Sequence, residues 1–272
     1  MTPPGPLRPS PAGMTVIIPV NAQVDLAIVN RLLDDLKPWM AQDAGRVLLV
    51  INNYAGDEPP GVAALRARGT SVIMEPRLAV RHGEVPPVAA RAVGARQAGS
   101  GLLVHLDADV RIPDSPALMR WYRQQYAAGV RVAATAVEFH EVPPGVSIRA
   151  RIAAHRTARW VKRVIFRTPV TRGSNYATDR DLFLTAYERG MIADELNVGP
   201  ALVALGARYA YSGDPNLRVL TSARRLRGGW LRLVRYLAYR LAYNVRALPV
   251  DDRAANRTRR SRDPRSRWQR PD

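Results

Sequence analysis

The chain has 272 residues, of which 47% are hydrophobic, and carries a formal net charge of +18. A chain of this length can bury one large core, so one domain with tails is the default expectation. The absence of cysteine excludes a disulfide framework and a thiolate metal site. The charge predicts attraction to nucleic acid, anionic lipid or phosphorylated substrates, and alone it does not choose among them.

The N-terminal segment, residues 1–13, is rich in proline and lacks the basic start and the apolar run of a signal peptide. We expect a disordered arm outside the fold. No stretch approaches the roughly 18 consecutive apolar residues of a transmembrane helix, so we expect no bilayer span. The lack of cysteine favours a reducing compartment, and we expect a cytoplasmic protein.

Short β-branched runs alternate with helical patterns along the first part of the chain. Residues 15–20 and 46–51 predict two buried parallel strands, and the apolar spacing of residues 24–36 predicts a helix between them. The alternation continues with predicted helices at 63–68 and 86–98 and predicted strands at 71–74 and 101–106. This order predicts an open, doubly wound α/β sheet.

Polar residues follow the first, second and fourth predicted strands. They are Asn21, Asn52, Asn53, Asp57, Asp107 and Asp109. Ligands of open α/β sheets bind in the crevice at the carboxyl ends of the strands, so we expect these side chains to converge on one site.

The Asp107-Ala108-Asp109 motif is the feature that points most directly to chemistry. Two carboxylates one residue apart at a strand end suit Mg²⁺ or Mn²⁺, which prefer oxygen ligands and bridge carboxylates to substrate phosphates. The competing interpretation is a solvated turn that caps a helix near Pro116. The position after several β-α alternations favours the metal site.

Several further short sequence blocks occur before and after this motif along the chain. They are Ile17-Ile18-Pro19-Val20-Asn21, Asn52-Asn53-Tyr54-Ala55-Gly56-Asp57, Ala90-Arg91-Ala92-Val93-Gly94, Gly173-Ser174-Asn175-Tyr176-Ala177, Asp194-Glu195 and Thr221-Ser222-Ala223-Arg224-Arg225. Over about residues 14–225 the sequence resembles the family-two inverting glycosyltransferases of the GT-A fold. The most specific block is the Ala-Arg-x-x-Gly helix, because Arg91 stands at the family's distance before Asp107.

The resemblance implies a GT-A domain over residues 14–225, a Rossmann-like, mostly parallel sheet flanked by helices. It implies a nucleoside-diphosphate-sugar as the donor, with UDP expected more than GDP as the nucleotide. It also implies Mn²⁺ or Mg²⁺ as the cofactor. Arg91 would help to hold the nucleotide, Asp107 would contact ribose or metal, and Asp109 would coordinate the metal. The other implied donor contacts are Pro19, Asn21, Asn52, Asn53, Asp57, Asn175, Arg224 and Arg225. The sequence departs from the family at Asn52-Asn53, where the family has paired acids.

The resemblance also implies a general base. The second acid of the family's Glu-Asp motif usually serves in this role, and that position is Glu195 in this sequence; because the order of the acids is swapped, Asp194 is the alternate. The base would remove the acceptor hydroxyl proton while the metal neutralises the departing diphosphate. The competing interpretation of Asp194 and Glu195 is ordinary negative charge at the start of a helix. The competing interpretation of Arg224 and Arg225 is that they begin a solvated basic helix.

The histidines carry less information. His105 lies within an apolar run, so we expect a buried core residue. His140, near Glu138 and Glu141, is expected at the surface rather than as a metal ligand.

Basic segments occupy the second half of the chain. Residues 148–166 fall where the resembled family builds its acceptor site, which favours an anionic or lipid-linked acceptor. Residues 226–250 predict a basic amphipathic helix, which either lies on an anionic membrane at its inner face or packs on the catalytic domain. Residues 251–272 predict a disordered, arginine-rich tail.

A rival class is a non-catalytic protein that binds nucleic acid or another anionic surface through its arginine clusters. The sequence contains no zinc-finger spacing, helix-turn-helix signal or aromatic sheet motif. We therefore expect no specific nucleic-acid partner.

Overall fold

The computed structural model describes residues 13–222 apart from residues 44, 141, 143–145 and 166. The predicted arm up to residue 12, the predicted basic helix at 226–250 and the predicted tail at 251–272 lie outside the described residues. In the part of the chain that the structure describes, no helix is both long and apolar enough to cross a membrane.

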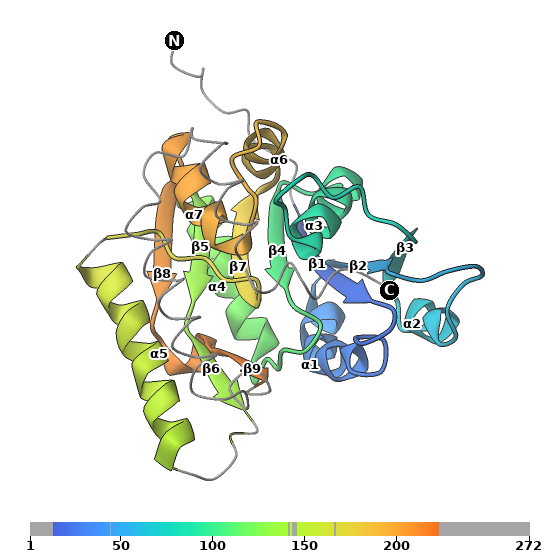
Figure 1. The fold of residues 1–272 in the computed structure, drawn as a ribbon, viewed down its shortest axis with the longest axis horizontal. Helices are drawn as coiled ribbons and strands as arrows, with labels where there is room; N and C mark the ends of the chain where they lie inside the picture. The colour runs from blue at the N-terminus through green and yellow to red at the C-terminus, as the bar shows by residue number, and fades with distance from the viewer. Residues whose placement is uncertain (1–12, 44, 141, 143–145, 166, 223–272) are drawn as a thin grey trace.

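A seven-stranded sheet forms the centre of the molecule, in the order β3-β2-β1-β4-β7-β5-β8 (Figure 1). Its strands are β1 (Met14–Asn21), β2 (Arg46–Asn52), β3 (Ser71–Glu75), β4 (Leu102–Leu106), β5 (Val130–Thr135), β7 (Asn175–Asp179) and β8 (Arg208–Ser212). β7 runs antiparallel to both of its neighbours, β4 and β5, while the other pairs are parallel. The predicted α/β fold with a mostly parallel sheet is confirmed.

Helices cover both faces of this sheet. They are α1 (Val29–Gln42), α2 (Val62–Ala67), α3 (Pro86–Gln97), α4 (Ser115–Ala127), α5 (Val146–Val164), α6 (Arg180–Glu188), α7 (Glu195–Ala204) and the short 3₁₀ helix η1 (Pro215–Leu217). Successive residues of a strand point to opposite faces. Val16 and Ile18 therefore join the core under α1, α2 and α4, whereas Ile17 joins the core under α3, α6 and α7.

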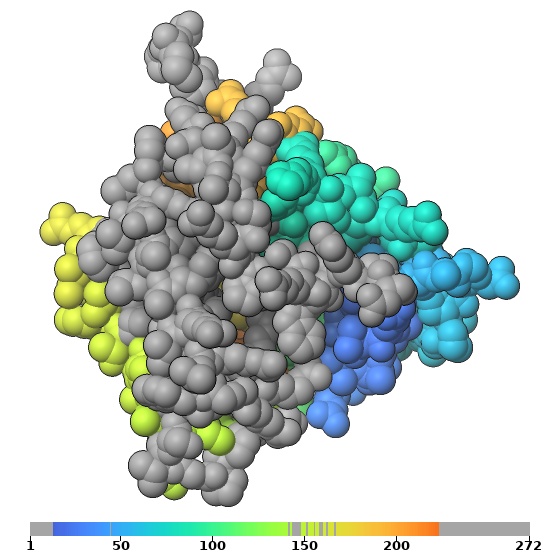
Figure 2. All heavy atoms as spheres, in the orientation of Figure 1, coloured from blue at the N-terminus to red at the C-terminus, as the bar shows by residue number. Residues whose placement is uncertain are grey.

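α5 occupies the outer flank of the molecule beyond β8 (Figure 1). In Figure 2 its yellow-green surface forms one flank, and the light-blue surface around α2 forms the opposite flank. A small second sheet pairs β6 (Val137–His140) in parallel with β9 (Val219–Ser222). The backbone of Arg111 bridges to Leu220, so this small sheet is tied to the segment that follows β4.

The first helix begins later than its apolar spacing predicts. Residues between β1 and α1 form turns, in which the Asp25 carboxylate accepts from the Asn21 backbone N–H at 3.1 Å and the Asn21 side chain accepts from the Gln23 N–H at 3.0 Å. Val24, predicted to open the buried stripe, is 60% exposed. The prediction of helix at residues 24–28 is therefore wrong, because local side-chain contacts to the backbone compete with helix formation there.

Candidate active site

Arg91 is carried into the centre of the molecule by α3. Gly94, one turn later, lets this helix approach β1 closely: a Cβ added there would lie 2.7 Å from Ile17 Cγ2 and 3.2 Å from Val50 Cγ2. The close packing leaves the Arg91 side chain completely buried, at 0% exposure. The Ala-Arg-x-x-Gly pattern thus combines a contact that seats the helix with a cation that the helix positions.

The guanidinium of Arg91 joins three segments that are far apart in sequence. It donates to Asp107 Oδ1 at 2.7 Å, to the Gly173 carbonyl at 2.6 Å and to Glu195 Oε1 at 3.1 Å. Burial lowers the pKa of Arg91, but electrostatic interactions with Tyr176, Asp107 and Glu195 outweigh burial and raise the pKa overall. Arg91 is therefore a fixed cation that holds Asp107 and Glu195 on the same side of the sheet.

Asp194 and Glu195 have different environments although they are neighbours. Asp194 is buried and caps α7, since its carboxylate accepts from the Leu196 N–H at 2.9 Å. The Glu195 side chain, 16% exposed, reaches Arg91. Burial and then the charge of Asp194 raise the pKa of Glu195, while Arg91 opposes the shift.

The loop before β7 fixes the position of Glu195. The Thr171 hydroxyl donates to the Glu195 carbonyl at 2.6 Å and accepts from the Gly199 N–H at 3.0 Å. Gly199 allows this approach, because a Cβ there would lie 2.0 Å from the Pro169 carbonyl oxygen. Thr171 belongs to no predicted block, since its contacts depend on tertiary packing that spacing does not reveal.

Gly173 is packed between the two carboxylates of the site. A Cβ added there would lie 3.1 Å from Glu195 Cγ and 3.2 Å from Asp107 Oδ1. The absence of a side chain at this position lets Asp107, Glu195 and the backbone of the loop meet around Arg91.

The ends of β1 and β2 meet as predicted. Asn21 and Asn52 are register partners, and the Asn53 amide donates to Asn21 Oδ1 at 3.2 Å. The Asn52 amide is buried and donates to the carbonyls of Val20 and Val50 at 3.2 and 3.3 Å. Its nitrogen is thus used to hold the two strand ends, while Asn53 is exposed in a left-handed conformation with φ 61°.

Pro19 and Asp57 occupy contrasting positions near this edge. Pro19 is buried in β1 opposite Val50 of β2. The pairing of β1 with β4 ends at Ile17, before Pro19, which has no N–H to donate. Asp57 lies in the exposed loop after β2. Donor contacts by these two residues stay predictions.

Asn175 is buried at the start of β7 and belongs to a hydrogen-bond network of the fold. The hydroxyl of Tyr122 donates to its Oδ1 at 2.6 Å, and its amide nitrogen donates to the hydroxyl of Thr135. Thr135 in turn donates to the Leu217 carbonyl at 2.7 Å. Both ends of the Asn175 amide therefore have partners within the protein, and the predicted donor contact is untested. The predicted donor residues Arg224 and Arg225 lie outside the described residues.

Asp107 and Asp109 follow β4 and are both partly exposed. The helix-capping role that competes with a metal site belongs instead to Asp114, whose carboxylate accepts from the Ala117 N–H at 2.9 Å. Among the described residues, no group of three or more His, Cys, Asp or Glu side chains is placed to hold a metal ion. A pair of carboxylates fits a hard divalent cation that takes its remaining ligands from substrate phosphates and water.

His105 lies in the core as predicted. It is fully buried, its Nε2 is 2.9 Å from the Thr178 hydroxyl, and its ring stacks on Tyr176 with centroids 4.5 Å apart. Burial and the charge of Arg91 lower the pKa of His105 well below its usual value, so the ring is neutral. His140 is partly buried at the end of β6.

A hollow opens at the carboxyl ends of β5 and β8, next to the loop that holds Gly173. It is lined by Ala134, Thr135, Val137, Arg163, Val170, Arg172, Asn175 and Tyr211. Arg172 directly precedes Gly173, and the Arg163 guanidinium lies over the Tyr211 ring at 4.1 Å from its centroid. The sequence indicates this hollow only through Asn175 and the charge of residues 148–166, because its lining comes from separate elements.

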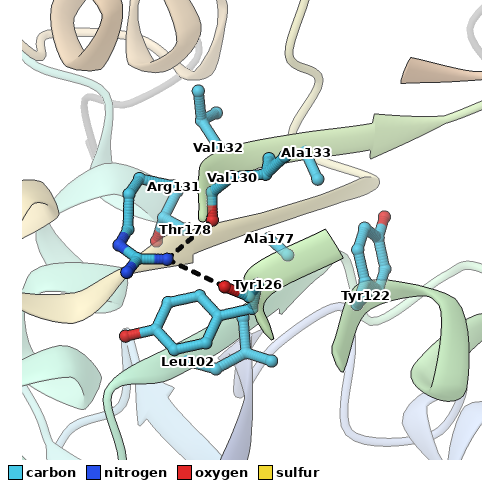
Figure 3. Close-up of a pocket in the computed structure, with 9 residues that line it drawn as sticks. All are labelled: Leu102, Tyr122, Tyr126, Val130, Arg131, Val132, Ala133, Ala177 and Thr178. Carbon is cyan, nitrogen blue, oxygen red and sulfur yellow. Dashed lines mark hydrogen bonds between the residues drawn. The ribbon is translucent and has the colours of Figure 1, made fainter. Parts of the chain in front are cut away.

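A smaller hollow lies near the amino ends of β4 and β5 (Figure 3). Arg131 reaches across it and donates to the carbonyls of Tyr126 and Val130, at 2.9 and 3.2 Å. Leu102, the first residue of β4, lines it, whereas Asp107 follows the last residue of that strand. This hollow is therefore remote from the Arg91 cluster.

Comparison with solved structures identifies proteins of similar fold. Mannosyl-3-phosphoglycerate synthase from Rubrobacter xylanophilus matches with a TM-score of 0.50 and 18% identity, over 86% of this chain and 72% of that one. Glucosyl-3-phosphoglycerate synthase from Mycobacterium tuberculosis matches with a TM-score of 0.50 and 16% identity, over 85% and 80%. The latter enzyme in complex with Mn²⁺, UDP and phosphoglyceric acid also matches, with a TM-score of 0.50 and 16% identity, over 85% and 78%.

No protein-family model and no curated protein sequence matches the chain. At these identities the structural likeness concerns the fold. The predicted GT-A fold is confirmed by it.

Proposed function

We propose that this protein is an inverting, metal-assisted glycosyltransferase that moves a sugar from a UDP-sugar to a hydroxyl group of an anionic acceptor. The observation that carries the proposal is the shared guanidinium of Arg91, which holds Asp107 at 2.7 Å and Glu195 at 3.1 Å. Asp107 follows the central strand β4, and Glu195 is the first residue of α7. Their shared contact with Arg91 supports a donor site and a general base that act side by side.

Glu195 is the general base in this proposal, and Asp194 is the positioning residue that caps its helix. Glu195 takes the acceptor hydroxyl proton as that oxygen bonds to the anomeric carbon, and the bond from this carbon to the diphosphate oxygen breaks with its electrons going to the diphosphate. A single displacement of this kind inverts the anomeric centre. The raised pKa of Glu195 suits the role, because a rise brings the pKa of a carboxylate base closer to neutral pH, where proton transfer to it is more favourable.

Asp107 and Asp109 are the residues that would hold Mn²⁺ or Mg²⁺ in this proposal. The ion would neutralise charge on the leaving diphosphate. The Mycobacterium tuberculosis enzyme of similar fold is described in complex with Mn²⁺ and UDP. This complex supports Mn²⁺ over Mg²⁺ as the metal and UDP over GDP as the nucleotide. In this proposal Arg91 orients Asp107, and the exposed side chain of Asn53, at the ends of β1 and β2, contacts the nucleobase or ribose.

The hollow beside Gly173 is the acceptor site in this proposal. Arg163 and Arg172 supply positive charge there, and guanidinium groups bind phosphate and carboxylate through paired hydrogen bonds. Phosphoglyceric acid is the acceptor-type molecule named with the enzyme of similar fold. A lipid-linked acceptor would present the same phosphate chemistry. Location in the cytoplasm at the inner face of a membrane, through residues 226–250, stays a prediction.

Calorimetric titration with UDP and GDP, each with and without Mn²⁺, tests the donor site. We expect UDP binding that requires Mn²⁺, is lost in Asp109→Ala and is unchanged in Asp34→Ala, which removes an exposed acid on α1. No binding of either nucleotide would overturn the proposal and favour the rival anionic-surface-binding protein.

The acceptor site is tested by kinetics with 3-phosphoglycerate and glycerol as probe acceptors. Loss of a charged hydrogen bond costs about 1.5–3 kcal/mol. We therefore expect Arg163→Gln and Arg172→Gln each to raise the KM for 3-phosphoglycerate by about tenfold or more. Arg208→Gln, at the far end of β8, should leave it unchanged. An unchanged KM for 3-phosphoglycerate in both variants, with glycerol used as efficiently as 3-phosphoglycerate, would contradict an anionic acceptor while leaving the donor site intact.

A further inference from the structure

Large apolar side chains are exposed at the C-terminal end of α5. Trp160 is 51% exposed, Val164 is 47% exposed, and Ile165, directly after the helix, is 60% exposed. Trp160 and Val164 are four residues apart, so they lie on one face of the helix. Single exposed apolar residues are ordinary, but a contiguous group marks an interaction surface.

Another side of α5, which adjoins this face, packs on the protein. Arg163 lies over the Tyr211 ring of β8 and lines the hollow beside Gly173. Ile152 and Val161 are partly buried. α5 lies on the flank of the molecule (Figure 1), so one side of the helix helps to build the hollow while Trp160 and Val164 stay exposed on the outer side.

The outer side is basic as well as apolar. Arg149 and Arg156 are exposed, and their spacing places them on the face of Trp160 and Val164. Arg156 also lies 3.5 Å from the Glu138 carboxylate. The sequence contains no acidic residue between Glu141 and Asp179. Positive charge thus surrounds the exposed apolar end of the helix without compensation from its own segment.

We propose that this outer side, formed by Arg149, Arg156, Trp160, Val164 and Ile165 and called the α5 face, docks on an anionic bilayer surface. A basic helix with an exposed tryptophan and aliphatic residues can insert its apolar side at the headgroup level while its arginines contact anionic lipid. Nucleic acid would use the arginines but offers no apolar layer for Val164 and Ile165. Charge and apolar surface together therefore favour lipid.

This surface is distinct from the predicted helix at 226–250 and does not depend on sugar transfer. It does have a consequence for the proposed acceptor site, because Arg163 extends from the same helix. Docking through the α5 face would hold the hollow near the bilayer, where a phosphate of a lipid-linked acceptor could reach it.

The absence of cysteine makes a site-specific test straightforward. Val164→Cys in the full chain would carry a single nitrobenzoxadiazole label in the α5 face. Ala64→Cys, exposed on α2 at the opposite flank, is the matched control (Figure 2). With phosphatidylcholine vesicles containing phosphatidylglycerol, we expect a blue-shifted, brighter signal at position 164 and none at position 64. No change at 164, or equal change at both positions, would overturn the proposal.

Vesicle co-sedimentation of unlabelled variants separates this face from the other basic segments of the chain. Removing one large apolar side chain from a lipid contact costs about 1.5–3 kcal/mol, which is about tenfold or more in partitioning. We expect that loss for Trp160→Gln and Val164→Gln, and none for Val24→Gln, which changes an equally exposed apolar residue elsewhere. Unchanged partitioning in both variants would overturn the proposal. It would also be overturned if Trp160→Gln abolished self-association of the protein but left its binding to vesicles unchanged. UDP binding should be the same in all three variants.

Discussion

The Arg91 guanidinium lies 3.1 Å from the Glu195 carboxylate, although 104 positions separate the two residues in the chain. The same guanidinium holds Asp107, so one buried cation fixes the distance between the proposed metal site and the proposed base. An enzyme that must align a donor and an acceptor gains from such fixed geometry, because misplacement of a reacting group by about 1 Å can cost a hundredfold in rate.

The pH dependence of activity should report the environment of Glu195. Burial and the charge of Asp194 raise its pKa, and only the ionised form can accept a proton. Activity should therefore fall on acidification at a higher pH than an exposed glutamate would give. Asp194→Asn keeps a capping side chain but removes the neighbouring charge, so the acidic limb of the kcat/KM profile should move to lower pH.

Glu195→Gln is the matched control for this profile. General-base catalysis contributes about 10²–10⁴-fold, so kcat should fall by that factor while Mn²⁺-dependent UDP binding remains. A variant that keeps more than a tenth of the activity would assign the base elsewhere, with Asp194 the next candidate.

Arg91 should be sensitive even to a change that keeps its charge. Arg91→Lys cannot reproduce three contacts in different directions, and Arg91→Met leaves two carboxylates without their cation. Breaking a buried ion pair from one side costs about 3–5 kcal/mol, so we expect a loss of that size in the free energy of unfolding of Arg91→Met and a smaller loss for Arg91→Lys. Denaturant unfolding measures both. Arg96→Lys, exposed on the same helix, should change the stability little.

Asn175 offers a test between a structural and a ligand role. Asn175→Ala leaves the buried Tyr122 hydroxyl without the partner that it contacts at 2.6 Å. An unsatisfied buried polar group costs about 1–3 kcal/mol, so this variant should lose stability by that amount. If the role is structural, UDP affinity measured by calorimetry should be unchanged, and Tyr122→Phe together with Asn175→Ala should cost less than the sum of the single changes. A large loss of UDP affinity would support the donor contact that the sequence predicts.

The part of the fold before Asp109 could be predicted because its signals are local. β-branched runs and helical spacing identified β1, β2, β3, β4, α2 and α3 near their observed bounds. The N-terminal turn before α1 was missed because Asn21 and Asp25 bind the backbone, a choice that apolar spacing does not reveal. The antiparallel insertion of β7 between β4 and β5 was not predicted either, since strand order depends on long-range pairing.

The candidate site shows the same difference between local and long-range signals. Arg91 lies in α3 and Asp107 follows the next element, β4, so a sequence motif could predict that the two residues pair. The hollow at Arg163 and Arg172 and the Thr171 anchor of Glu195 could not be predicted in this way, because their parts come from two helices, a loop and four strands. Packing decides such contacts, and composition alone indicated only that positive charge gathers in this region.

Gly173→Ala tests the geometry of the whole site with a single methyl group. The added Cβ would lie 3.1 Å from Glu195 Cγ and 3.2 Å from Asp107 Oδ1, which is closer than ordinary contact, so both side chains must yield by a few tenths of an ångström. We expect the Arg91 contacts to lengthen, the activity to fall by about tenfold or more, and UDP binding to weaken, while the free energy of unfolding changes by only about 1–3 kcal/mol. Gly99→Ala is the control, because a Cβ at that glycine meets nothing within 4 Å. Kinetics and calorimetry on the two variants would separate the outcomes. Full activity in Gly173→Ala would mean that the spacing of the two carboxylates is not critical for the reaction, which would contradict the role of Arg91 as their common anchor.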